Sequence, residues 1–266
     1  MSTDTGSSAG GATLPLDLEF RGRIALVVGG GSGIGAEVGR QLAAMGSEVI
    51  LMDRSTAAVE ERVKCIQNSG GAATAIVADV TDLMQMQEAL QVVSARHGGI
   101  DLAVNAAGVA SKRAQLHECS AEDWDRVIGV NLTGLFNCLK VQIPLMLSRD
   151  RPAIVNIASI AGLVGMAGSG SYCASKHGVI GLTKACALDY ARSIRVNAVA
   201  PGFIATSLLG SVVPADGGLE KLAPLQPMKR IGTVTEVADL ITFLLSSRAS
   251  FITGSVFNCD GGFVAQ

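Results

Sequence analysis

Short apolar runs alternate with longer segments of helical periodicity along the chain. The apolar runs are rich in β-branched residues and span residues 23–28, 47–52, 72–78, 100–105, 153–159, 194–200 and 254–259. The segments with helical periodicity lie between them, at about 34–45, 55–69, 82–97, 121–147, 172–191 and 235–247. Apolar strands that alternate with helices are typical of a parallel sheet covered on both faces. The pattern predicts a single-domain, doubly wound α/β fold with a central parallel sheet of about seven strands flanked by helices.

Three segments depart from this alternation. Residues 1–19 have no basic start and no long apolar run, so we expect a flexible N-terminal tail ahead of a domain spanning 20–266. The irregular segment 203–230 is long enough to be a lid, and with segment 109–118 it is expected to decide the substrate. The apolar side chains of the lid suggest a hydrophobic wall. They are Leu208, Leu209, Val212 and Val213.

Composition and charge narrow the function classes. The 266 residues are 48% hydrophobic and carry a formal net charge of −2, which offers no basic field for nucleic acid or an anionic membrane. No apolar run reaches transmembrane length. The six cysteines form no CxxC pair and the three histidines show no ligand spacing with them, so we expect neither a disulfide framework nor a metal site. A reducing, cytoplasmic location is the natural interpretation.

A glycine-rich loop follows the first predicted strand. In "VGGGSGIG" (28–35), Gly29, Gly33 and Gly35 lie at the turn from strand to helix. Glycine lets the backbone approach a diphosphate, and the N–H groups at the helix start favour its negative charge. A tight strand-to-helix turn without a ligand is the alternative, but the position after the first strand favours a dinucleotide site.

Asp53 ends the second predicted strand, twenty residues beyond Gly33. A carboxylate there can accept hydrogen bonds from the ribose hydroxyls of an adenosine and would repel a 2′-phosphate, so it favours NAD over NADP. A solvated turn aspartate is the alternative interpretation. The neighbouring Arg54 could accommodate a 2′-phosphate, but the strand-end position of Asp53 carries more weight.

Tyr172 and Lys176 lie four residues apart and share a helix face. A nearby ammonium favours the phenolate and is expected to lower the pKa of the tyrosine, which could then exchange a proton with an alcohol or ketone. Ser159, thirteen residues upstream at the end of a predicted strand, could hold the reacting oxygen. Alone, the Tyr–Lys pair would be interpreted as a surface contact.

Together these features resemble the short-chain dehydrogenase/reductase family over about residues 20–263, in an NAD-preferring branch similar to 3-oxoacyl-carrier-protein reductases. The matching motifs are "GGGSGIG", "ADVTD" (78–82), "NAAG" (105–108), "VNLTGLF" (130–136), "NIAS" (156–159), "YCASK" (172–176), "APGFIAT" (200–206) and "DGGF" (260–263). The resemblance implies a Rossmann fold and a catalytic tetrad of Asn131, Ser159, Tyr172 and Lys176. Tyr172 would be the acid/base, Ser159 would orient the substrate oxygen, and Lys176 would hold the nicotinamide ribose. Asn131 would anchor a proton-relay water.

The resemblance also implies the remaining cofactor contacts, in addition to those of Tyr172 and Lys176. These are Ser32 and Ile34 at the diphosphate, Asp79 and Val80 at the adenine, Asn105 and Ala106 beside the ribose, and Ile204 and Thr206 after the Pro201–Gly202 turn at the carboxamide. Three of the polar residues also have structural interpretations: Asn131 as a buried group bonded to backbone, Asn105 as a strand cap, and Thr206 as a helix N-cap. A homotetramer is implied, with helices 121–147 and 172–191 at one interface and residues 251–266 at another.

These observations predict an NAD(H)-dependent enzyme that interconverts a secondary alcohol and a ketone. The apolar lid favours a neutral, partly hydrophobic, cyclic or aryl substrate. Three alternatives stay open: an NADPH-dependent reductase of 3-oxoacyl thioesters, a sugar or polyol dehydrogenase, and a non-catalytic dinucleotide-binding sensor or scaffold.

Overall fold

The computed structural model describes residues 19–211 and 218–266. Within them, seven strands form one parallel sheet in the order β3-β2-β1-β4-β5-β6-β7. The strands are β1 (Ile24–Val28), β2 (Glu48–Asp53), β3 (Ala72–Val77), β4 (Leu102–Asn105), β5 (Ala153–Ile157), β6 (Arg195–Pro201) and β7 (Val256–Cys259). The strand order reverses between β1 and β4, which places a ligand crevice at their carboxyl ends. The predicted sheet is confirmed.

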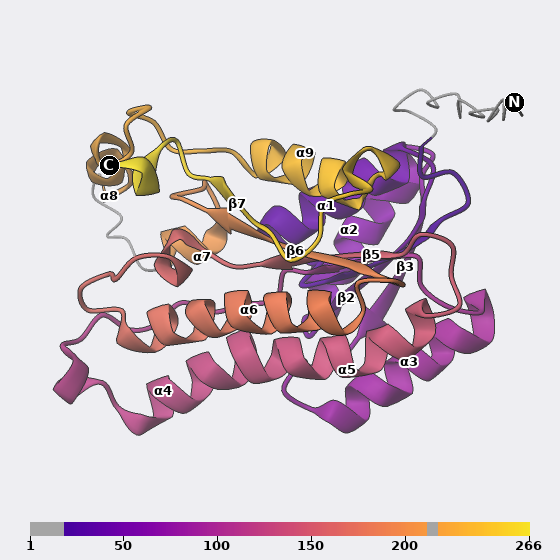
Figure 1. The fold of residues 1–266 in the computed structure, drawn as a ribbon, viewed down its shortest axis with the longest axis horizontal. Coiled ribbons are helices and arrows are strands. Elements are labelled where there is room, and N and C mark those ends of the chain that lie inside the picture. Colours follow the sequence, from indigo (N-terminus) through magenta and orange to yellow (C-terminus); the bar gives the residue numbers. More distant parts are fainter. Residues whose placement is uncertain (1–18, 212–217) are drawn as a thin grey trace, which may run out of the picture.

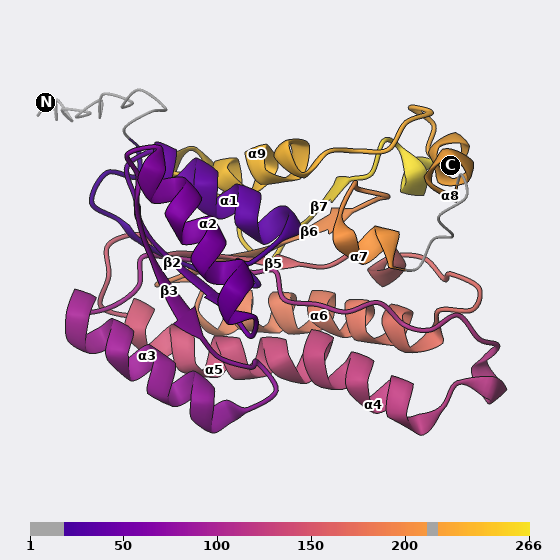
Figure 2. The same ribbon diagram turned by 180° about the vertical axis from the view of Figure 1, so that it is seen from behind.

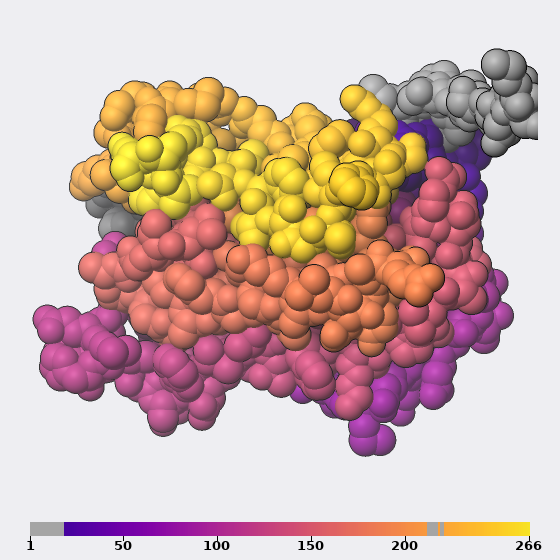
Figure 3. All heavy atoms as spheres, in the orientation of Figure 1, coloured from indigo at the N-terminus to yellow at the C-terminus, as the bar shows by residue number. Residues whose placement is uncertain are grey.

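Helices cover both faces of the sheet (Figures 1 and 2). One layer contains α1 (Gly33–Ala44), α2 (Thr56–Asn68) and α9 (Val234–Leu245). The other contains α3 (Leu83–His97), α4 (Ala121–Ile128), α5 (Gly134–Met146) and α6 (Gly170–Asp189). In the space-filling view, α6 forms an orange strip beside the yellow C-terminal residues (Figure 3).

The core explains why the strands read as uninterrupted apolar runs. All five residues of β1 are buried. Leu26 and Val28 face the core beneath α3, α5 and α6, whereas Ala25 and Val27 face the core beneath α1 and α9. Because each strand is covered on both sides, neither face needs polar residues.

The predicted helix 121–147 is one helical run in the structure, and it contains an irregular turn. It consists of α4 and α5 joined by a π-helical turn, Gly129–Thr133, and the backbone stays helical at both junctions. Gly134 packs closely against the loop that follows β3. A Cβ on Gly134 would lie 2.6 Å from Val80 Cγ2. The extra residue of the turn places Asn131, which is 2% exposed, against the interior.

The predicted lid contains short helices that the sequence pattern does not reveal. They are α7 (Ser207–Gly210), α8 (Gly218–Leu222) and a 3-10 turn, Ala223–Leu225. Val212 and Val213 of the expected apolar wall lie outside the described residues, as do residues 1–18 of the expected tail.

The first described residue, Glu19, contacts the C-terminal part of the chain. Glu19 accepts hydrogen bonds from the backbone and hydroxyl of Ser247, both at 2.8 Å.

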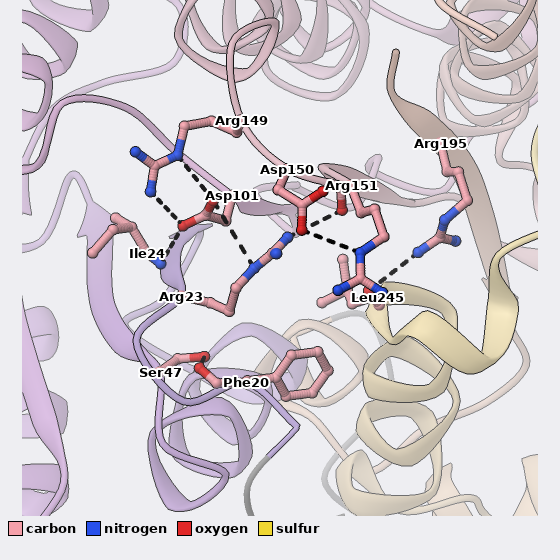
Figure 4. A network of polar contacts seen from close by, with 10 residues as sticks. All are labelled: Phe20, Arg23, Ile24, Ser47, Asp101, Arg149, Asp150, Arg151, Arg195 and Leu245. Atoms are coloured by element: carbon pink, nitrogen blue, oxygen red, sulfur yellow. Dashed lines mark hydrogen bonds and ion pairs between the residues drawn. The ribbon is translucent and has the colours of Figure 1, made fainter. Parts of the chain in front are cut away.

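A polar network joins the amino ends of the strands, at the edge of the sheet opposite the ligand crevice (Figure 4). The Asp101 carboxylate accepts hydrogen bonds from the Arg149 guanidinium at 2.8 and 2.9 Å and from the Ile24 backbone at 2.8 Å. Burial acts to raise the pKa of Asp101, but these donors outweigh it and the pKa is lowered. The network ties β1 to β4 away from the candidate site.

Candidate active site

A cavity of about 480 Å³ opens at the carboxyl ends of β1, β4, β5 and β6. Most of the residues predicted from the sequence line it. These are Gly29, Ser32, Gly33, Ile34, Gly35, Asp53, Asp79, Val80, Ala106, Ser159, Tyr172, Lys176, Pro201, Gly202, Ile204 and Thr206. The predicted residues Asn105 and Asn131 lie behind its wall, beside a small internal void.

The glycine loop forms a cradle that larger residues would fill. Gly29 has a φ of 79°, and a Cβ there would lie 2.5 Å from the Ala107 nitrogen. A Cβ on Gly35 would lie 2.2 Å from the Gly29 carbonyl oxygen. Gly33, with a φ of 54°, begins α1 at the cavity wall. The bare backbone and the start of a helix fit a dinucleotide diphosphate.

Asp53 connects the glycine loop to the end of β2. One carboxylate oxygen accepts a hydrogen bond from the Gly31 nitrogen at 3.0 Å, and the other accepts one from the Ser55 nitrogen at 3.1 Å. The side chain is half-buried and lines the cavity, as does the exposed Arg54. Asp53 and Arg54, the two residues expected to decide between NAD and NADP, therefore both line the cavity.

Lys176 presents a buried ammonium to the cavity. The residue is 4% exposed, and its Nζ donates to the Ile157 carbonyl oxygen at 2.8 Å. Burial lowers the pKa of Lys176 to about 8. An ammonium has three donors, so its position in the wall fits a polyhydroxyl ligand such as a ribose.

Tyr172 lies in the first turn of α6, with Ser159 just beyond β5. The Lys176 ammonium lies 5.8 Å from the centre of the tyrosine ring. Burial raises the pKa of Tyr172, and the Ser159 hydroxyl acts in the opposite direction. The pKa of Tyr172 is therefore raised and not lowered as predicted, because loss of solvation dominates.

Asn131 holds the loop that follows β4. Its Oδ1 accepts from the Val109 nitrogen at 2.8 Å, and its Nδ2 donates to the Val109 carbonyl at 2.9 Å and to the Ser175 hydroxyl at 3.1 Å. A Cβ on Gly108 would lie 3.4 Å from Asn131 Oδ1 and 3.7 Å from Lys176 Nζ. Asn131 thus makes the backbone contacts of its structural interpretation and still lies near Lys176.

Asn105 ends β4 within a buried amide network that the sequence did not predict. Its Nδ2 donates to Gln142 at 3.1 Å and to Asn156 at 2.9 Å, and its Oδ1 accepts from Gln142 at 2.8 Å. Asn156 in turn donates to Thr183 at 3.0 Å. The network joins β4 and β5 to α5 and α6 behind the cavity, so Asn105 supports the wall and does not line it.

The chain after β6 closes another side of the cavity. Thr206 caps α7 by accepting from the Leu209 nitrogen at 3.3 Å, and it also lines the cavity. The Phe203 nitrogen donates to the buried side chain of Gln226 at 2.8 Å. This contact, which the sequence did not predict, fixes the turn after Pro201.

The remaining wall contains residues that were not named as site residues. Among them are Arg113, Met166, Ser169 and Leu222, together with Leu208 and Leu209 of the expected apolar wall. Arg113 belongs to segment 109–118. The expected role of this segment in substrate choice was the sequence feature that could have pointed to Arg113. These residues lie on the chain that follows β4, β5 and β6, whereas Asp53 and Asp79 lie at or after the ends of β2 and β3, on the other side of the sheet order.

The fold and this cavity suit a dinucleotide ligand, and similarity to known proteins identifies an oxidoreductase. A family model described as enoyl-(acyl carrier protein) reductase matches residues 29–264. The chain is 39% identical over 249 residues to cyclohexanol dehydrogenase of Acinetobacter sp. (strain SE19), covering 93% of this chain and 97% of that protein. It is 39% identical over 248 residues to a 3-oxoacyl-[acyl-carrier-protein] reductase of Thermotoga maritima, covering 93% and 100%.

Two further matches have the same extent. Cis-4-hydroxycyclohexanecarboxylate dehydrogenase of Sinomonas cyclohexanicum is 40% identical over 247 residues, covering 92% of this chain and 98% of that protein. The crystal structure of levodione reductase superposes with a TM-score of 0.88 at 33% identity, covering 92% and 99%. The chain belongs to the short-chain dehydrogenase/reductase family.

Proposed function

We propose that the protein interconverts a secondary alcohol and a ketone with NAD(H), on a substrate built on an apolar ring. One observation supports this most strongly. The cavity brings Ser159, Tyr172 and Lys176 together between the glycine loop and the apolar side chains of Leu208 and Leu209. The relatives named for cyclohexane alcohols support the ring.

Tyr172 and Ser159 would carry the proton chemistry. In the direction of oxidation, the Tyr172 oxygen accepts the hydroxyl proton while the carbinol carbon loses a hydride. The bound nicotinamide supplies the hydride acceptor. Ser159 donates a hydrogen bond to the substrate oxygen and holds it against the phenol, which stabilises the charge that develops there.

Lys176 and Asn131 would support Tyr172. The Lys176 ammonium, close to the tyrosine ring, stabilises the phenolate when the proton leaves. Its other donors bind the nicotinamide ribose. Asn131, whose Oδ1 lies close to Gly108 of the cavity wall, would anchor the route by which the proton reaches solvent.

The cofactor preference follows from Asp53. Its carboxylate would accept hydrogen bonds from both adenosine ribose hydroxyls and repel a 2′-phosphate. Asp79 and Val80 would border the adenine. The remaining predicted contacts would hold the diphosphate, through Ser32 and Ile34, and the carboxamide, through Ile204 and Thr206.

A second candidate is an NADPH-dependent reductase of 3-oxoacyl thioesters. Arg54 lines the cavity next to Asp53 and could pair with a 2′-phosphate, and the Thermotoga relative is named for this reaction. We favour NAD because Asp53 is half-buried and fixed by two backbone donors, whereas Arg54 is exposed.

We further propose a cytoplasmic homotetramer. Leu188 on α6 is 79% exposed and Phe251 is fully exposed, which would suit contacts with other subunits along α6 and the C-terminal segment. In the described part of the chain, no helix is both long and apolar enough to cross a membrane.

A cofactor-reduction assay tests the proposed function. The purified protein is offered NAD or NADP with cyclic, aryl, hydroxyacyl and polyol secondary alcohols. Faster turnover of a cyclic or aryl alcohol with NAD is the expected result. Turnover confined to NADPH and a 3-oxoacyl thioester would favour the second candidate and assign the cofactor choice to Arg54.

A further inference from the structure

We propose that Arg113 forms an anion subsite at the substrate end of the cavity, so that the ring substrate carries a carboxylate. This inference rests on the proposed function for its substrate, but the subsite can be tested by binding alone. It replaces the neutral substrate expected from the sequence with an apolar ring that bears one acidic group.

Arg113 is held beside the segment that leads into the catalytic helix. The Ala114 nitrogen donates to the Gly168 carbonyl at 3.1 Å, and the Arg113 Nη2 donates to the Ala167 carbonyl at 3.3 Å. Residues 166–169 continue into α6, whose first turn contains Tyr172. Met166, Ser169 and Tyr172 all line the cavity, so one continuous wall connects Arg113 to the reacting phenol.

The distribution of charge on the cavity wall singles out this arginine. Among the described lining residues, five are charged: Asp53, Arg54, Asp79, Arg113 and Lys176. The first three lie at or after the ends of β2 and β3, and Lys176 lies on α6 close to Tyr172. Of these five charged residues, Arg113 is therefore the one on the part of the wall expected to face the substrate. The apolar residues of that part are Met166, Leu208, Leu209 and Leu222.

The guanidinium has the chemistry to bind a carboxylate. It has five N–H donors in a planar fork that matches the two carboxylate oxygens. Within the described residues, the Arg113 guanidinium donates one hydrogen bond, to the Ala167 carbonyl at 3.3 Å. The other donors can therefore bind a ligand without breaking a structural bond.

Side chains of α4 hold the loop that contains Arg113. The Asp123 carboxylate accepts from the Lys112 nitrogen at 3.1 Å and from Arg126 at 2.6 Å, and Arg126 donates to the Ala110 carbonyl at 2.7 Å. Asp123 is 5% exposed and Ser111 is 6% exposed. These contacts fix the backbone before Arg113, and the hydrogen bond from Ala114 to Gly168 fixes it after Arg113. This support lowers the entropic cost of binding.

Calorimetric titration separates the subsite from the reaction. Cyclohexanecarboxylate and its neutral isostere cyclohexanecarboxamide are titrated into the protein saturated with NADH. Arg113→Gln removes the charge, and Lys112→Gln is the matched control because Lys112 is the adjacent exposed cation and does not line the cavity. Kinetics with 4-hydroxycyclohexanecarboxylate and cyclohexanol are measured in parallel.

We expect the parent protein to bind the carboxylate about tenfold more tightly than the amide, since a charge-assisted pair made by an exposed guanidinium is worth at most roughly that factor. Arg113→Gln should remove this preference, and Lys112→Gln should keep it. Equal binding of the two ligands by the parent, or an unchanged preference in Arg113→Gln, would overturn the subsite. Carboxylate selectivity that depends on Arg113, without turnover of any secondary alcohol, would support the subsite and contradict the proposed reaction.

Discussion

The substitution Lys176→Met should make the protein more stable while removing its activity. Lys176 is 4% exposed in the cavity wall, and burial lowers its pKa to about 8 from 10.5. An unfolded chain returns the amine to water and to its ordinary pKa. The folded protein therefore loses stability by keeping this group charged at neutral pH. Methionine has a similar length and no charge, so it removes this cost.

The size of the effect follows from the change in pKa. A fall from 10.5 to about 8 corresponds to roughly 3 kcal/mol of unfavourable free energy at neutral pH. Loss of the hydrogen bond to the Ile157 carbonyl offsets about 1 kcal/mol. The net gain is about 2 kcal/mol, or roughly 4–6 °C in Tm for a chain of this length.

The pH dependence gives the prediction its sign. Between about pH 8 and 10.5 the unfolded chain binds more protons at Lys176 than the folded chain does, so the parent gains stability as pH rises through this window. The advantage of the variant should be complete below pH 8 and should shrink toward pH 10.5.

Thermal and urea unfolding followed by circular dichroism at pH 7 and pH 10 measure this difference. Lys184→Met is the matched control, since Lys184 lies on the same helix and is exposed. A Lys176→Met variant that is less stable than the parent at pH 7, or whose advantage does not change with pH, would refute the reasoning.

Three further predictions concern the cofactor and the proton. Gly35→Ala should abolish dinucleotide binding measured by NADH fluorescence, because its Cβ would lie 2.2 Å from the Gly29 oxygen. The control Gly165→Ala, whose Cβ would meet no atom within 4 Å, should bind normally. Equal affinities of the two variants would contradict the proposed binding of the diphosphate by the glycine loop. Asp53→Ala should raise the ratio of kcat/KM for NADP over NAD by at least about tenfold; an unchanged ratio would show that Asp53 does not select the cofactor. Alcohol oxidation should accelerate as pH rises from neutral, because the raised pKa of Tyr172 keeps the phenol protonated at neutral pH, and an acidic optimum for oxidation would contradict its role as the base.

The sheet could be predicted because burial on both faces makes each strand a continuous apolar run. The π-helical turn at Gly129–Thr133 could not, since a single widened turn inside a long helix has no distinct signature in the pattern of apolar residues. The short helices α7 and α8 escaped because they span too few residues to show a period.

The candidate site divides in the same way. Residues of local motifs, such as Gly35 and Tyr172, line the cavity where expected. Asn105 does not line it, because its side chain turns into a network with Gln142 that depends on tertiary packing. The pKa of Tyr172 depends on solvent exclusion, which spacing to Lys176 alone does not reveal. Arg113 lies in an irregular segment, where neither periodicity nor a motif indicates that its side chain lines the cavity.

The central claim is that Tyr172 is the proton donor and acceptor of a dehydrogenase. Its most direct test compares Tyr172→Phe with Tyr190→Phe, which alters the chain's other tyrosine, in cyclohexanol oxidation and in NADH binding. The account predicts that Tyr172→Phe loses turnover while binding NADH nearly as well as the parent, and that Tyr190→Phe retains both. Turnover by Tyr172→Phe at a rate close to the parent's would contradict the account.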